Sequence, residues 1–205
     1  RMATQRAVEE AKDAAWTDIN TQVSQMRSSV DVLRLERGLE SISATSSDES
    51  VATVAVTGSA TPGTLTFTVD QLAATHQVTT ASGFSEATST VGAGTVSVTI
   101  GADTFDVATS STTTLTELAS SIRSLDGVDA SVLKVADGDY RLNITAVEGG
   151  AAGVFTLTST GTSLDTEQIL SQGADAQLTV GSGPGAVQVT RASNTITDLI
   201  AGAEL

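Results

Sequence analysis

The feature that most constrains the fold lies in the first 40 residues, where apolar side chains recur at alternating intervals of three and four. The positions are Trp16, Ile19, Val23, Met26, Val30 and Leu33. This spacing is the a/d seam of a heptad repeat, and the residues between these positions are mostly polar. The pattern therefore predicts one coiled-coil-like helix over roughly residues 4–37, which at 1.5 Å per residue is about 50 Å long.

A single helix cannot bury its own seam. Each seam side chain stabilises the fold by about 1.5–3 kcal/mol, and only where another element covers it. The rest of the sequence holds no second helical pattern of comparable length. We therefore expect the seam residues to pack within or between subunits against a helix of a longer chain, a second subunit, or the remaining residues of this chain.

After Gly38 the apolar period changes from heptad spacing to two, which is typical of strands. Leu65, Phe67 and Val69 alternate with threonines, and later strand pairs are separated by turn residues at Gly101–Asp103, Asp137-Gly138 and Gly181–Gly185. Residues 74–94 show no firm period. A capping box, Thr114 with Glu117, opens one short helix with apolar residues at i, i+3, i+4 and i+7: Leu115, Leu118, Ala119 and Ile122. The pattern predicts an α+β fold that is mostly β.

The charge of the chain argues against two classes of partner. The net charge is −14, and residues 41–205 hold four basic against seventeen acidic residues. Such a body repels nucleic-acid phosphates and anionic membrane surfaces. No apolar run approaches the roughly 20 residues that span a bilayer, so we expect no membrane insertion. Cysteine is absent, which fits either a small-residue composition or a protein exported unfolded, in which stray thiols are a liability.

The sequence offers no set of catalytic or ligand-binding residues. The only histidine, His76, has no cysteine beside it and no recognisable motif, so it is read as a structural or surface residue. The acidic stretch 125–140 lacks the ligand spacing of a calcium loop. The Gly181–Gly185 segment joins two strands and is no phosphate cradle. We therefore predict a protein that is not an enzyme, with no cofactor and no metal site.

The motifs SSDE at Ser46–Glu49, ATPG at Ala60–Gly63, VxQLA at Val69–Ala73 and SNTI at Ser193–Ile196 occur in one order along the chain. With the segments around them, they resemble the flagellar hook-associated protein 2 (filament cap) family. Residues 41–73 carry the SSDE start, the ATPG turn and the strand ending in VxQLA. Residues 114–159 look like the IN motif that the family shares with flagellins. Residues 173–205 are similar to the start of its C-terminal region, including the SNTI motif at Ser193–Ile196. One departure is GSGPGA, where the family usually has a short DG turn.

The resemblance implies a nested layout of three parts. A leg domain begins with the long helix, a middle β domain is split, and an outer β-rich domain with a helix near 114–124 is inserted into it. The implied boundaries are 1–41 for the incomplete leg, 42–75 with 173–205 for the middle domain, and 76–172 for the outer domain. It also implies that residues 190–205 end at a cut, before helices that would cover the seam. We therefore expect the seam to be exposed in this chain or buried by a neighbouring copy.

The function that the resemblance implies is structural. Family members cap the distal end of the bacterial flagellar filament as a ring-like homo-oligomer, promote flagellin polymerisation and prevent subunit loss. The implied partners are further copies of the chain, flagellin, hook–filament junction proteins and an export chaperone. The implied place is outside the cell, after secretion through the flagellar export apparatus. The alternatives are another axial protein, such as a junction protein or flagellin, and a surface adhesin or glycan-binding β module.

Overall fold

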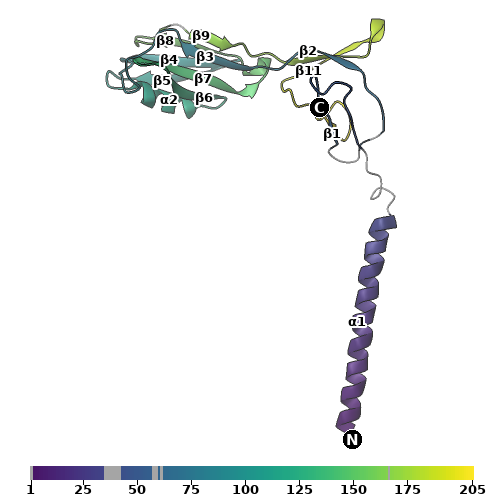
Figure 1. Ribbon diagram of the computed structural model, residues 1–205. Helices are drawn as coiled ribbons and strands as arrows, with labels where there is room; N and C mark the ends of the chain where they lie inside the picture. Colours follow the sequence, from purple (N-terminus) through teal and green to yellow (C-terminus); the bar gives the residue numbers. More distant parts are fainter. Residues whose placement is uncertain (1, 35–42, 57–59, 61, 166) are drawn as a thin grey trace. The chain divides into compact units, whose positions relative to one another are not determined.

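The first compact unit, Arg1–Ala44, contains one long helix. The computed structural model describes residues 2–34, 43–56, 60, 62–165 and 167–205, and within the helix the side chains of 12, 14–28 and 30. Helix α1 spans Met2–Arg34 (Figure 1), close to the predicted 4–37. Residues 35–37 lie outside the described residues. A coiled-coil partner for α1 stays a prediction.

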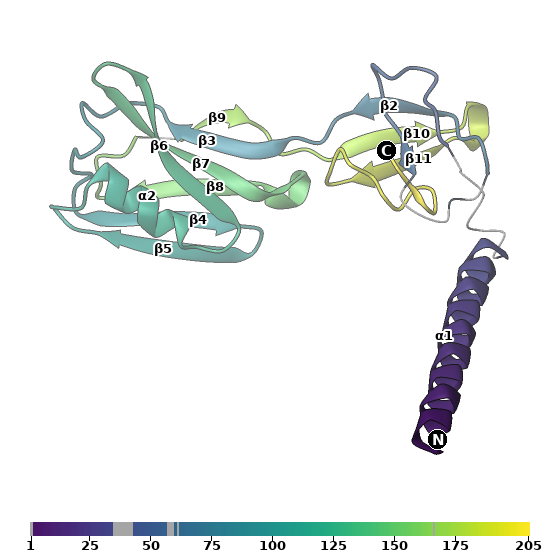
Figure 2. The ribbon, with the colours of Figure 1, turned by 60° about the horizontal axis from the view of Figure 1, so that its bottom comes forward.

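The second unit, Thr45–Leu205, contains a small antiparallel sheet in the order β11-β10-β2. Strand β2 (Phe67–Gln71) pairs with β10 (Ala176–Val180), and β10 pairs with β11 (Val187–Arg191). Figure 2 shows that segments far apart in the sequence lie side by side here. Ala176, Leu178 and Ile196 form its buried core, with Phe67, Val69, Ala73, Leu199 and Leu205 packed against them. The predicted alternation of Leu65, Phe67 and Val69 is confirmed, because all three are half-buried and the threonines between them are exposed.

Residues Val51–Val56 (VATVAV) have the apolar alternation of a strand, but most of them do not form one. Only Ala55–Val56 forms a strand, β1, and it pairs with β12 (Ala203–Glu204). The reason lies upstream, where the carbonyl oxygen of Asp48 accepts the amides of Val51 and Ala52 at 3.2 Å each. These backbone groups are used in a turn and cannot enter a ladder.

Two further sheets of the same unit share one large core. The first has the order β6-β7-β3-β9 and the second the order β5-β4-β8, with helix α2 packed against β5, β6 and β7. The bounds are β3 Thr75–Thr80, β4 Gly94–Ile100, β5 Asp103–Thr109, α2 Leu115–Arg123, β6 Val128–Ala136, β7 Asp139–Gly149, β8 Phe155–Thr160 and β9 Glu167–Ser171. Two short 3-10 helices, η2 at Ala151–Gly153 and η3 at Gly183–Gly185, lie in loops. The fully buried side chains include Val78, Val96, Val98, Leu118, Leu142 and Ile144.

The local signals predicted for this part are confirmed. The β4–β5 hairpin turns where Ile100 faces Asp103, and the β6–β7 hairpin where Ala136 faces Asp139. Gly138 has φ +78° in that turn, a conformation that glycine adopts without strain. The capping box of α2 is complete in both directions, and its four predicted apolar residues are all buried. The fold is mostly β with two α-helices in the described residues, as expected for an α+β chain.

Two strands were missing from the sequence-based prediction, β3 and β9. Strand β3 lies between β7 and β9, and four of its six residues are buried. A strand covered on both faces shows no polar–apolar alternation, so the period-two signal is absent from residues 75–80. Strand β9 pairs with β3 across a register irregularity, and this also breaks its pattern.

Candidate assembly surfaces

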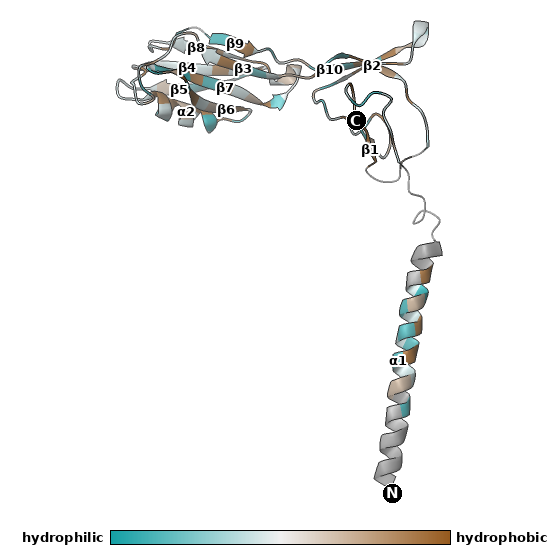
Figure 3. Ribbon diagram, viewed as in Figure 1, coloured by the Kyte–Doolittle hydropathy of each residue, from teal (hydrophilic) through white to brown (hydrophobic). Residues whose placement is uncertain are grey.

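The predicted helix seam is exposed along α1. The exposed fractions are 69% for Trp16, 51% for Ile19, 55% for Val23, 68% for Met26 and 46% for Val30. Leu33 lies in the helix, but its side chain is outside the described residues. At 100° per residue, the six positions fall within an arc of about 100°. Figure 3 shows apolar residues interspersed with polar ones along the described part of the helix.

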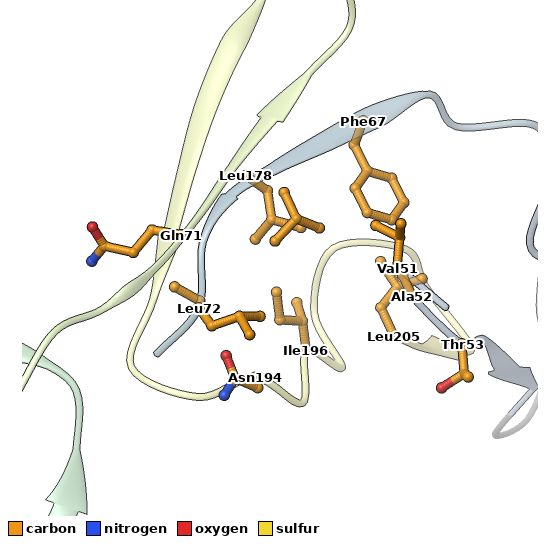
Figure 4. A pocket seen from close by; sticks show the side chains of 12 residues that line it. Val51, Ala52, Thr53, Phe67, Gln71, Leu72, Leu178, Asn194, Ile196 and Leu205 are labelled. Carbon is orange, nitrogen blue, oxygen red and sulfur yellow. The ribbon is translucent and has the colours of Figure 1, made fainter. Parts of the chain in front are cut away.

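A second apolar surface is a cavity of about 210 Å³ under the small sheet. Figure 4 shows side chains of β2, β10 and the segments near Val51 and Ile196 that point into it. Its lining is Val51, Ala52, Thr53, Phe67, Val69, Gln71, Leu72, Ala176, Leu178, Asn194, Ile196 and Leu205. Leu72 is 63% exposed and Val51 58% exposed, so the cavity is open to solvent at these residues. Mostly apolar side chains line it, which suits packing better than chemistry.

The SNTI motif, Ser193–Ile196, is attached to the small sheet by hydrogen bonds to backbone groups beside β2. The Asn194 side chain accepts the Ala73 amide at 2.7 Å and donates to the Ala73 carbonyl at 3.0 Å, so it acts as a strand partner for that residue. Ile196 and Leu205 exchange two backbone hydrogen bonds, of 2.9 and 3.0 Å. The two hydrogen bonds of Asn194 join the VxQLA segment, Val69–Ala73, to the return segment, residues 190–205, across more than 100 positions of sequence. The roles of Asn194, Ile196 and Leu205 in this unit are structural.

Arg191 and Asp198 form a two-pronged ion pair on the same return segment. Arg191 Nε lies 2.9 Å from Asp198 Oδ1, and Arg191 Nη2 lies 2.8 Å from Asp198 Oδ2. The hydrogen bond from Arg191, and then its charge, lower the pKa of Asp198 below its usual 3.8. The same bond raises the pKa of Arg191. Both side chains are exposed to solvent, so the pair orients the loop more than it stabilises the fold.

His76, which sequence left as a structural or surface residue, is structural. It is 2% exposed, and both ring nitrogens are hydrogen-bonded to backbone groups. The acidic stretch before Tyr140 forms local ion pairs, Lys134 with Asp137 and Arg141 with Asp139. Among the described residues, no group of three or more histidine or acidic side chains is placed to hold a metal ion. Within the same residues, no helix is long and apolar enough to cross a membrane.

The first 76 residues match the family model described as "Flagellar hook-associated protein 2 N-terminus". This confirms the resemblance drawn from the motifs in residues 41–73. A search of curated proteins gave no match.

Solved structures resemble the β-rich unit at low sequence identity. The D2-D3 domains of the flagellar cap protein from Serratia marcescens match with 23% identity and a TM-score of 0.62, over 74% of this chain and 88% of that one. Those from Escherichia coli give 24% and 0.63, over 74% and 84%. The flagellar cap protein of Bdellovibrio bacteriovorus gives 21% and 0.57, over 77% and 89%. At this identity the likeness shows a shared fold.

Proposed function

We propose that this chain, whose residues 1–76 match the model of the flagellar hook-associated protein 2 N-terminus, is a structural subunit of a flagellar filament cap. The observation that carries the proposal is that a family-model match and several structural matches to cap proteins occur in the same chain. The family model covers residues 1–76, and the folds of three solved cap proteins match over 74–77% of the chain. The structural matches alone show only a shared fold, and the family model adds the N-terminal segment.

The proposed division into domains follows the strand pairing. Strand β2 leaves the small sheet before the larger sheets begin, and β10 and β11 return to it after they end. This supports a split middle domain, 42–75 with 173–205, and an inserted outer domain, 76–172. The remaining part, 1–41, is the start of a leg domain whose other helices are not in this sequence.

The proposed mode of action is packing, because the described residues of α1 and of the small sheet present exposed apolar side chains. The five described seam residues of α1 are about half to two thirds exposed. Covering them would stabilise the contact by roughly 5–9 kcal/mol before the entropic cost of ordering is subtracted. We propose that the six seam residues, Leu33 included, pack chiefly against helices of the same full-length protein. This packing would hold the leg domain rigid.

The proposed partners are those that a subunit of a cap at the tip of a growing filament would meet. The subunit would assemble with further copies of itself into a ring, contact flagellin, and follow the hook–filament junction proteins. An export chaperone would engage regions outside this sequence. The proposed place is the outer end of the flagellum, after export. The cap would promote flagellin insertion and prevent subunit loss by steric confinement, without enzymatic chemistry.

No observation on the β-rich unit favours the adhesin or glycan-binding alternative. The cavity described above has a mostly apolar lining with one aromatic side chain, Phe67. The axial-protein alternatives share the IN motif but are not what the N-terminal family model describes.

The test is deletion of the gene in the source bacterium, followed by complementation. We expect the deletion strain to release unpolymerised flagellin into the medium and to carry short or absent filaments. The intact gene should restore filaments. Normal filaments in the deletion strain would refute the cap function.

A matched pair of seam variants separates packing from added charge. Ile19→Glu with Met26→Glu places two carboxylates on the seam, seven residues apart. Thr21→Glu with Ser28→Glu places two carboxylates on the opposite face at the same spacing. Only the first double variant should fail to restore filaments while still being secreted. If both restore filaments equally, the seam has no role in assembly.

A further inference from the structure

The chain's only histidine lies at a structural joint of the β-rich unit. His76 is the second residue of β3 and lies two positions after Ala74, which exchanges two backbone hydrogen bonds with Ala174, of 2.8 and 3.0 Å. The Gly150 amide also donates to the Ala74 carbonyl, at 3.2 Å. Near Ala74 the chain passes from the small sheet to the larger sheets, and near Ala174 it passes back to the small sheet.

Both nitrogens of the His76 ring bind backbone groups from the two segments that meet it. The Gly173 amide donates to Nδ1 at 3.2 Å, and Nε2 lies 3.0 Å from the Phe155 carbonyl oxygen. The ring also makes an edge contact with the Phe155 ring, with 4.9 Å between centroids. A Cβ on Gly173 would lie 3.1 Å from the His76 Cβ and 2.8 Å from the Gly150 oxygen, so the segments are closely packed.

The partners fix the protonation state of the ring. A backbone amide can only donate and a carbonyl oxygen can only accept. Nδ1 must therefore carry a lone pair and Nε2 the proton, which is the neutral Nε2–H tautomer. A proton on Nδ1 as well would set two hydrogen-bond donors, Nδ1–H and the Gly173 N–H, against each other. It would also give the ring a positive charge, although His76 is only 2% exposed.

We propose that His76 is a pH-sensitive lock on this joint. Protonation of Nδ1 breaks the hydrogen bond from Gly173 and releases the returning segment from β3. The joint around Ala74, Gly150 and Ala174 then opens on acidification while the cores of the sheets remain folded. The cap function is not needed for this inference, which concerns the β-rich unit alone.

Four carboxylates and one guanidinium lie on or beside the elements that pack against β3. Asp139, Arg141 and Glu148 are on β7, Glu167 is on β9 and Asp175 follows Ala174; β3 itself, η2 and β8 carry no charge. Asp139 is paired with Arg141, Glu167 accepts the Leu157 amide at 2.7 Å, and Asp175 accepts the Ala151 amide at 2.7 Å. None of these carboxylates is hydrogen-bonded to the ring in the described part of the chain, so no carboxylate contact offsets a charge on it.

The direct test is nitrogen NMR of the ring together with amide hydrogen exchange, on the unaltered protein between pH 8 and pH 4.5. We expect the Nε2–H tautomer at pH 8. As the ring takes up a proton, protection of the Gly173 and Ala174 amides should fall at least tenfold after correction for intrinsic exchange. The Val98 amide in the core should keep its protection. An Nδ1–H tautomer at pH 8, or unchanged Gly173 protection across the ring titration, would overturn the proposal.

His76→Asn is the matched variant, because an asparagine Oδ1 can take the acceptor place of Nδ1 and does not titrate. Its Gly173 amide should show the same protection at pH 8 and pH 4.5. Persistent acid opening in this variant would also overturn the proposal. If the variant does not fold, the measurements on the unaltered protein decide the matter.

Discussion

Two neighbouring threonines of β3 provide a matched test of how burial and hydrogen bonding set the stability of the β-rich unit. Thr79 is 3% exposed, and its Oγ1 donates to the Leu142 carbonyl at 3.0 Å. Thr80 is fully buried, and its Oγ1 has no hydrogen-bond partner in the described residues. We expect Thr79→Val to destabilise the protein and Thr80→Val to stabilise it.

The magnitudes follow from what each hydroxyl does. Valine has nearly the shape of threonine and the same β-branch, so neither change opens a cavity or alters the strand preference. Removing the unpaired hydroxyl of Thr80 relieves a desolvation cost of about 1–3 kcal/mol. Removing the paired hydroxyl of Thr79 costs about 1 kcal/mol. For a unit of this size, 1 kcal/mol shifts Tm by about 2–4 °C, so the two variants should differ by at least about 4 °C.

The assay is urea unfolding followed by the far-ultraviolet circular dichroism of the sheets, since the only tryptophan, Trp16, is on α1 and does not report on β3. The midpoint should move in opposite directions for the two variants, with an unchanged m-value. Destabilisation of Thr80→Val by 1 kcal/mol or more would refute the reasoning, because it would mean that the Thr80 hydroxyl is paired, for instance with a buried water.

Two further predictions concern a glycine and an ion pair. Gly150→Ala should lower the unfolding free energy by well over about 1 kcal/mol, because φ is +79° and the new Cβ would lie 2.3 Å from Asp175 Oδ1. Gly138→Ala, at φ +78° with open space around it, should lower it by only about 1 kcal/mol. Equal losses for the two variants would contradict this. Arg191 lowers the folded-state pKa of Asp198, so this carboxylate stabilises the fold above its unfolded pKa near 3.8 and the effect is lost as pH falls through the lowered value. Asp198→Asn should therefore flatten the fall in unfolding free energy between pH 5 and pH 2, and parallel curves would count against the pair.

Local interactions explain the parts of the fold that sequence predicted well. The capping box Thr114–Glu117 and the turn at Asp137-Gly138 act over two to four residues, so their signals are contained in the segment itself. The same holds for the heptad spacing of α1, which depends only on the helical period. Such features can be read before any tertiary structure is known.

The roles of His76 and Asn194 could not be read in this way. The partner of His76 Nδ1 is 97 residues away, and the partner of Asn194 is 121 residues away. Strand β3 also escaped notice, because burial between β7 and β9 removes the alternation that marks a strand with one wet face. Of these positions, only Asn194 lies in one of the family motifs, where the VxQLA and SNTI segments occur together.

The sequence by itself determined that this chain has one long amphipathic helix and a β-rich remainder with one capped helix, because periodicity, caps and turns are local properties. Only the tertiary structure decided that β2 pairs with β10, that the single histidine bridges two segments at a joint, and that the buried Thr80 hydroxyl has no hydrogen-bond partner among the described residues. The physical reason is that burial and hydrogen-bond partnership belong to pairs of distant residues, whereas conformational preference belongs to each short segment.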